Sequence, residues 1–182
     1  MSFLDDWAKK AAEERSTAGI GDIAELSPEE RSKAFDVAAG HLREEFTDEI
    51  ESLLHDVLLP DESIIYKVRS SQSGDRSQLV LTNKNLVIIN KGLFGGQAQD
   101  VGGGLLGVLM GRARVSVRIY PIGEIRSVEI QPLKGITVGH LQVLTYATSE
   151  RDNESKFLFD NHIGYFKAIH VYRRIRELQG AQ

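Results

Sequence analysis

Two short apolar runs flank a polar centre between Leu79 and Asn90. The segment reads Leu-Val-Leu-Thr-Asn-Lys-Asn-Leu-Val-Ile-Ile-Asn, so aliphatic and β-branched residues lie on either side of a Thr-Asn-Lys-Asn centre. Such side chains pack well on a pleated surface, and Asn83 and Asn85 tolerate the left-handed backbone conformation that a tight reversal needs. The segment predicts a β-hairpin, which constrains the fold more than it constrains the function.

The whole region beyond Pro60 has the pattern of an antiparallel β structure. Apolar and polar residues alternate, and turn residues recur roughly every ten residues. From Asn161 onward the apolar spacing becomes helical, which predicts a closing helix. A twisted sheet of this size is expected to curl into a partly open barrel whose seam the helix covers. The strands that we expect are 62–69, 78–82, 85–91, 113–120, 125–131, 138–146 and 154–159.

Residues 1–58 have a helical pattern instead. Apolar spacing predicts a short helix over 3–12, and a capping box at Ser27-Pro28-Glu29-Glu30 predicts the start of a second helix. Pro60 stops this second helix because proline cannot donate a backbone hydrogen bond. Gly40 is the position at which such a long helix would bend or divide. The apolar stripe of this helix consists of Phe35, Ala39, Leu42, Phe46, Ile50, Leu53 or Leu54, and Val57.

The charge is divided unevenly along the chain. Residues 1–60 hold 6 Lys and Arg against 15 Asp and Glu, whereas residues 61–182 hold 16 against 11. The net charges of the two parts are therefore −9 and +5, from a total of −4. An acidic segment of this kind can lie against the basic part, dock a basic partner or keep the protein soluble, and carboxylate pairs such as Glu44-Glu45 are expected to be solvated charge on a helix.

Three segments carry a family resemblance. They read Leu-Pro-Asp-Glu-Ser-Ile-Ile-Tyr over 59–66, Leu-Thr-Asn-Lys-Asn-Leu-Val-Ile-Ile over 81–89, and Tyr-Pro-Ile-Gly-Glu-Ile-Arg-Ser-Val over 120–128. In order and spacing they resemble bacterial pleckstrin-homology-like (GRAM-like) domains, and the resemblance extends over 59–178. The chain departs from the pattern at Asn85, where the family often has Arg.

The resemblance implies an α+β fold. It is a seven-stranded, antiparallel, partly open barrel capped by a C-terminal helix and here preceded by N-terminal helices. We expect an acidic helical appendage over 1–58 and a pleckstrin-homology-like domain over 59–182 with a glycine-rich insert at 92–111. The resemblance also implies a binding role without enzymatic activity, and several family members form ring-shaped homo-oligomers.

Two groups of basic residues are candidate anion sites. Eukaryotic relatives bind phosphoinositide head groups through Lys and Arg at the first strand pair, which implies such a role for Lys67, Arg69 and Arg76. A second row, Arg112, Arg114 and Arg118, alternates with Val115, Val117 and Ile119, so we expect the apolar set to point inward and the arginines outward. For the first group the solvated face of an antiparallel sheet is the favoured explanation. The second row could face a membrane, a nucleic acid or an acidic neighbour, and the acidic helices of this same protein are the nearest candidate. Nucleic acid is the least supported partner, because aromatic residues are not interleaved with these cations.

The insert at 92–111 combines eight glycines with a cluster of apolar residues. Residues 102–107 match the letters of a dinucleotide fingerprint, but neither a preceding strand nor a following helix accompanies them. Exposed apolar side chains are costly in water, so we expect them to be covered by the protein's own helices or by a neighbouring subunit. The alternative is shallow membrane insertion, with Arg112 and Arg114 at the head groups. The apolar residues are Leu105, Leu106, Val108, Leu109 and Met110.

Catalytic patterns are absent from the sequence. The five histidines do not form a helical metal pair, the chain has no cysteine, and no nucleophile elbow or phosphate loop is present. We therefore predict no catalytic residue, no metal site and no cofactor, and we expect His140 to be a hydrogen-bonded sheet histidine. The chain start lacks signal-peptide features, and no apolar run is long enough to span a bilayer, so a cytoplasmic location is expected, with peripheral membrane attachment as an alternative.

These observations favour a non-catalytic binding or assembly module that self-associates or binds a protein. The alternative function is peripheral binding of anionic lipid head groups through the basic strand residues. A third hypothesis, a small-molecule carrier, has no residue signature. The residues expected to make protein contacts are Phe35, Leu42, Phe46, Ile50, Leu105, Leu106, Leu109 and Met110.

Overall fold

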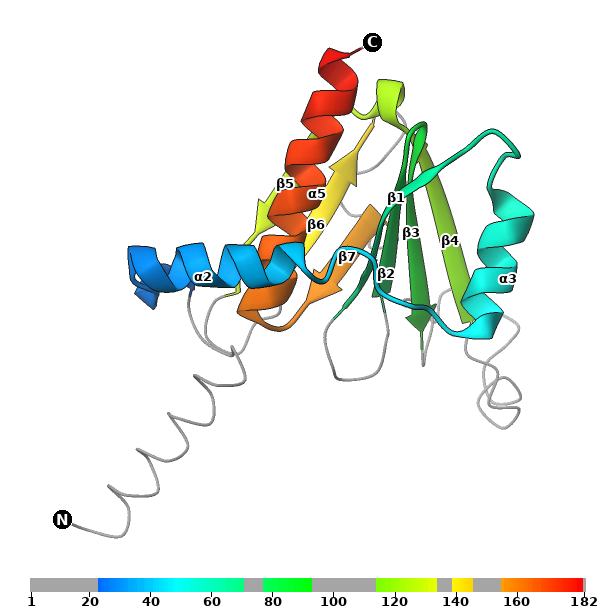
Figure 1. The fold of residues 1–182 in the computed structure, drawn as a ribbon. Helices are drawn as coiled ribbons and strands as arrows, with labels where there is room; N and C mark the ends of the chain where they lie inside the picture. Colours follow the sequence, from blue (N-terminus) through cyan, green and yellow to red (C-terminus); the bar gives the residue numbers. More distant parts are fainter. Residues whose placement is uncertain (1–22, 71–76, 93–113, 134–138, 146–154, 182) are drawn as a thin grey trace, which may run out of the picture.

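The computed structural model describes residues 23–70, 77–92, 114–133, 139–145 and 155–181. In these residues seven strands form two antiparallel sheets, ordered β1-β2-β3-β4 and β5-β6-β7 (Figure 1). The strands are β1 Ile64–Arg69, β2 Ser77–Thr82, β3 Asn85–Gly92, β4 Arg114–Pro121, β5 Ser127–Gln131, β6 Gly139–Leu144 and β7 Lys156–Phe159. The helices are η1 Ile23–Glu25, α2 Pro28–Ala39, α3 Asp48–Val57, η2 Ile122–Glu124 and α5 His162–Gly180.

The predicted hairpin is confirmed as β2 and β3. Its strands pair from Ser77 with Asn90 to Leu81 with Leu86. The Thr82 hydroxyl closes the turn by accepting the Asn85 N–H at 2.8 Å and the Lys84 N–H at 3.1 Å. Asn83 ties the hairpin tip to the start of β1, because its Oδ1 accepts the Ser63 N–H at 2.9 Å.

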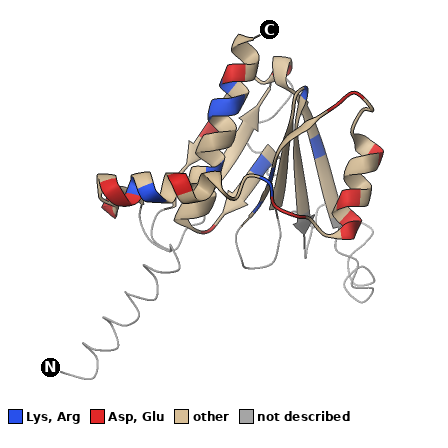
Figure 2. Cartoon of the chain, in the orientation of Figure 1, with Lys and Arg blue, Asp and Glu red and all other residues tan. Residues whose placement is uncertain are grey.

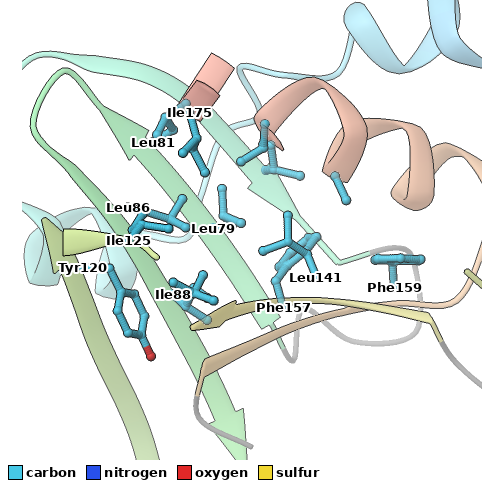
Figure 3. Close-up of a cluster of buried hydrophobic side chains, with 14 of the residues drawn as sticks. Leu79, Leu81, Leu86, Ile88, Tyr120, Ile125, Leu141, Phe157, Phe159 and Ile175 are labelled. Carbon is cyan, nitrogen blue, oxygen red and sulfur yellow. The ribbon is translucent and has the colours of Figure 1, made fainter. Parts of the chain in front are cut away.

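The inner faces of both sheets enclose one apolar core. Leu79, Leu81, Leu86 and Ile88 of the hairpin are fully buried in it (Figure 3). They lie in one cluster with Leu141, Val143, Phe157 and Phe159 of the second sheet and with Ala168, Val171 and Ile175 of α5. Helix α5 thus covers the opening between the sheets, as the sequence predicts for the closing helix.

The outer face of the first sheet is also covered. Helix α3 lies across it, and Ile50 and Leu54 form a second cluster with Val80, Val87 and Ile89 (Figure 1). Every residue of β2 is consequently buried. Strands with both faces buried have continuous apolar runs rather than alternation. This double burial explains the two unbroken apolar runs of the hairpin.

Two polar side chains join the sheets at one corner of the barrel. The Ser77 hydroxyl donates to Asn90 Oδ1 at 2.7 Å and accepts the Leu158 N–H at 3.3 Å. The Asn90 amide nitrogen donates to the Lys156 carbonyl at 3.2 Å. Strand β7 is therefore fastened to β2 and β3 by side chains, not by a continuous ladder.

Each predicted strand matches an observed one, with bounds that agree within two residues. Strand β1 begins at Ile64 instead of residue 62, because the Glu62 carboxylate accepts hydrogen bonds from Thr82 and Asn85 at the hairpin tip. Strand β5 begins at Ser127 instead of residue 125, because the preceding residues form the short η2 turn. The capping box at Ser27 and Glu30 is confirmed, with bonds of 2.8 and 3.3 Å.

The long helix predicted from Pro28 to Val57 is interrupted at Gly40, the position at which the sequence predicts a bend or a division. It divides into α2 and α3, and residues 41–47 between them, here called the strap, are not helical. Gly40 lies at the break and weakens helix formation there. The strap instead hydrogen-bonds to the edge of β1, whose backbone groups would otherwise stay unpaired. The helix predicted over 3–12 lies outside the described residues.

We predict that Ile50→Ala lowers the free energy of unfolding by about 2–5 kcal/mol, because its fully buried side chain fills the space between α3 and the sheet. Denaturant unfolding measures this change. Ser52→Ala, at an exposed position of the same helix, is the matched control and should change stability little. A loss of under about 1 kcal/mol for Ile50→Ala would contradict core packing of α3.

Candidate interaction surface

The strap pairs with the outer edge of β1 through a single parallel bridge. The Lys67 N–H donates to the Leu42 carbonyl at 2.8 Å, and the Glu44 N–H donates to the Lys67 carbonyl at 2.9 Å. Arg43 pairs with Lys67 in a parallel bridge. Leu42 is 7% exposed and belongs to the inner core cluster. The edge of β1 is thus occupied by an extended segment of the same chain.

Glu44 is the polar anchor of the strap. Its Oε1 accepts from the Lys167 ammonium of α5 at 2.8 Å, and its Oε2 accepts the Arg69 N–H of β1 at 2.6 Å. The side chains of Lys167 and Glu44 are 7% and 16% exposed. Charge-assisted hydrogen bonds shielded from water are strong, and removing one partner of a buried pair leaves an uncompensated charge. This carboxylate therefore connects the strap, the first strand and the closing helix.

A second ion pair lies where the strap meets α3. The Lys67 ammonium pairs with the Glu51 carboxylate and lies 4.8 Å from the centre of the Phe46 ring. Glu51 Oε1 also accepts the Phe46 N–H at 3.2 Å. The contact between a cation and an aromatic face adds to the ion pair. Lys67 is consequently bound to the protein's own acidic segment.

Helix α2 packs against α5 through one aromatic residue. The Phe35 ring stacks on His170 with centroids 3.8 Å apart, and the Arg173 guanidinium lies 4.7 Å from its centre. The Phe35 carbonyl also lies 3.0 Å from His170 Nε2. Phe35 is therefore half-buried on the protein itself.

Acidic and basic side chains meet where the N-terminal part touches the barrel. Figure 2 shows Asp and Glu on α2, α3 and the segment between them, and Lys and Arg on α5 and on several strands. The pairs Glu44–Lys167 and Glu51–Lys67 join the two regions. The acidic segment therefore packs against the basic part of the same chain, which is one of the three roles predicted for it.

The basic residues expected to form an anion site do not come together as one group in the described residues. Lys67 is ion-paired, and the Arg69 N–H is bonded to Glu44. Arg118 is exposed on β4 opposite Ile88, whose side chain faces the inner core. The side chains of Arg76, Arg112 and Arg114 lie outside the described residues.

The predicted orientation of β4 needs correction. Val115 and Val117 do not point into the barrel but pack with the outer cluster beneath α3, and Ile119 is 43% exposed. Side chains alternate along a strand, so Arg118 lies on the opposite, inner face near the sheet edge. The prediction assumed that the outer face meets solvent, whereas α3 covers it.

The predicted contact residues have two kinds of outcome. Leu42, Phe46 and Ile50 are at most 8% exposed and form part of the chain's own packing, which accounts for their apolar character. The insert residues Leu105, Leu106, Leu109 and Met110 lie outside the described residues.

Sequence reasoning missed Glu44 and Lys167. The pair Glu44-Glu45 was expected to be solvated, but only Glu45 is exposed. The partners of the Glu44–Lys167 bond are 123 residues apart, so no local pattern could connect them.

The architecture defines the class of fold. Two antiparallel sheets of four and three strands, closed by one C-terminal helix, form a pleckstrin-homology-like barrel. No protein-family model matches the chain, and no curated protein matches it. None of the described helices combines the length and the apolar character needed to cross a membrane.

Two solved bacterial structures are similar to this chain. A DUF1696-family protein with a pleckstrin-homology domain from Shewanella loihica is 16% identical, with a TM-score of 0.45, covering 76% of this chain and 97% of its own. A pleckstrin homology domain from Shewanella amazonensis is also 16% identical, with a TM-score of 0.47, covering 79% and 96%. The strand order and helix packing of this chain are themselves the basis for its fold class.

We predict that Gln78→Met raises the free energy of unfolding by about 1–2 kcal/mol. Gln78 is fully buried in β2, and neither polar atom of its amide has a hydrogen-bond partner among the described residues. Replacing an unpaired amide by an apolar side chain of similar length removes its desolvation cost. Denaturant unfolding, with the exposed Gln131→Met as control, tests this. Destabilisation by Gln78→Met would mean that the amide has a partner in solution.

We predict that His140 contributes to acid sensitivity. Burial, followed by the Lys156 ammonium, lowers the pKa of His140, while Glu129 opposes the shift. The unfolded chain therefore binds this proton more readily than the folded protein, so stability falls as pH drops below the ordinary value of 6.5. His140→Gln should lose less stability than the wild type between about pH 7 and about pH 5, measured by denaturant unfolding. The exposed His55→Gln is the control, and an unchanged pH profile for His140→Gln would contradict the prediction.

Proposed function

We propose that this protein is a non-catalytic binding module that assembles with copies of itself. The observation that carries the proposal is an exposed apolar side chain on β4, the last strand of the first sheet. In the described part of the chain this eight-residue strand pairs only with β3. Ile119, on that strand, is 43% exposed.

A strand at the edge of a sheet can pair with another chain, and natural proteins usually protect such edges with charge, proline or a cover. The edge of β1 has such a cover, because the strap pairs with it. An exposed apolar side chain on the opposite edge favours burial against a second molecule. The exposure of Ile119 on an edge strand supports self-association through β4.

Binding of anionic lipid is the weaker hypothesis. Two lysines of the described barrel, Lys67 and Lys167, are already paired with carboxylates of the same chain. A phosphate group would have to replace these internal partners. No contact in the described residues favours that exchange.

We predict that Ile119→Lys lowers the oligomeric mass of the full-length protein, because a charge on an edge strand opposes strand pairing. Light scattering coupled to size-exclusion chromatography, over a series of protein concentrations, measures the mass. Leu158→Lys is the matched control, because Leu158 is 39% exposed on the second sheet. A strictly monomeric wild-type protein at the highest concentration would eliminate the proposal, and equal masses for the two variants would eliminate β4 as the contact.

A further inference from the structure

The strap uses a recognised mode of peptide binding. An extended segment that adds to a sheet edge gains affinity from main-chain hydrogen bonds and specificity from pockets for alternate side chains. Both kinds of contact are present, because Leu42 and Glu44 share the two main-chain bonds with Lys67. Leu42 and Glu44 also bury their side chains, whereas Arg43 between them is exposed.

The strap also shows what this edge recognises. The first buried side chain is a leucine packed into the inner core cluster. The second is a glutamate whose carboxylate is held by the Lys167 ammonium and by the Arg69 N–H. Arg43 between them is exposed, so the residue at this position of a bound segment can be of any type. A segment that fits has a large apolar residue followed, two positions later, by a carboxylate.

The charge of Lys167 makes the acidic residue obligatory. Its side chain is 7% exposed, and Glu44 is the carboxylate placed against it. If another segment covered Lys167 without supplying a carboxylate, a largely buried ammonium would lack a counter-ion, which is strongly destabilising. An occupant that displaces the strap must therefore bring a carboxylate of its own.

The elements on either side of the strap have contacts of their own, and Phe46 near its end packs with α3 in the outer cluster. Helix α3 has its own contacts, because Ile50 and Leu54 pack on the sheet and Glu51 pairs with Lys67. Helix α2 ends at Gly40, whose N–H bonds to the Val37 carbonyl. Between these ends, His41, Arg43 and Glu45 are exposed.

We propose that the edge of β1 beside α5 is a binding site for an extended acidic segment of a partner protein, and that the strap occupies this site until the partner displaces it. The chemistry of the segment is a large apolar residue, any residue, and then Glu or Asp. In the closed form the strap is an internal competitor. This site is separate from the β4 edge and does not depend on self-association.

The experiment opens the site in the full-length chain and offers the segment in trans. Glu44→Lys places a cation against Lys167 and should release the strap. The probe is a fluorescent peptide with the sequence of residues 39–47, followed by fluorescence anisotropy. We expect Glu44→Lys to bind this peptide at least about tenfold more tightly than the wild type, whose tethered strap competes at a high effective concentration.

Three controls and a second opening variant separate recognition of the peptide from general loosening of the fold. Glu45→Lys makes the same charge change at the exposed neighbouring residue and should bind like the wild type. A peptide with Lys in place of its glutamate at position 44 should not bind Glu44→Lys. The double variant Glu44→Lys, Lys167→Glu restores a pair of opposite charge and should close again. Glu44→Gln is a milder opening variant, whose fold, like that of Glu44→Lys, is checked by circular dichroism.

Three results would overturn the proposal. The first is equal peptide affinity for the wild type and for both folded opening variants. The second is binding that does not depend on the glutamate of the peptide. The third is displacement of the peptide from Glu44→Lys by wild-type protein as effectively as by free peptide, which would identify a second copy as the occupant. Oligomeric mass is measured separately, so failure here leaves the β4 proposal standing.

Discussion

The burial of β2 and β3 on both faces is the constraint on which the rest of the structure depends. Leu79, Leu81, Leu86 and Ile88 need the second sheet and α5, whereas Val80, Val87 and Ile89 need α3. Each face left open would expose several large apolar side chains, at roughly 25 cal/mol for each Å². The hairpin therefore needs a cover on both faces. Helix α5, which follows it in the sequence, covers the inner core, and helix α3, which precedes it, covers the outer face.

Helix α3 precedes the barrel in the sequence, and this order fixes the path of the segment between α2 and α3. The segment that joins α2 to α3 must pass from α5 to the outer face of the first sheet, and this route runs along the edge of β1 (Figure 1). Pairing with β1 satisfies backbone groups of both segments, and Glu44 adds a link to α5. A covering helix, a protected edge and an ion pair thus follow from one topological requirement.

Local patterns in the sequence were enough to predict much of the fold. Thr82 and the asparagines beside it predict the turn, Ser27 and Glu30 predict the helix start, and alternation predicts the strands, because each depends on neighbouring residues. The sequence predicts a bend or division at Gly40, but it does not predict the non-helical strap that follows, because Leu42, Phe46 and Ile50 are buried at spacings that suit one continuous helix. The same limit applies to Glu44 and Lys167, whose contact exists only after the barrel has closed. The inward direction predicted for Val115 and Val117 was wrong, because their side chains pack beneath α3 on the outer face. The position of α3 cannot be inferred from the sequence of the strand.

The corner made by Ser77 and Asn90 has a consequence for how the barrel can vary. The two sheets are held there by hydroxyl and amide side chains that reach the main chain of β7, rather than by a strand shared between them. Backbone ladders fix the spacing of strands, but side-chain links of this kind can lengthen or shorten with a single substitution. At this corner the separation of the sheets depends on individual side chains, so a single substitution there can change it without altering any strand pairing.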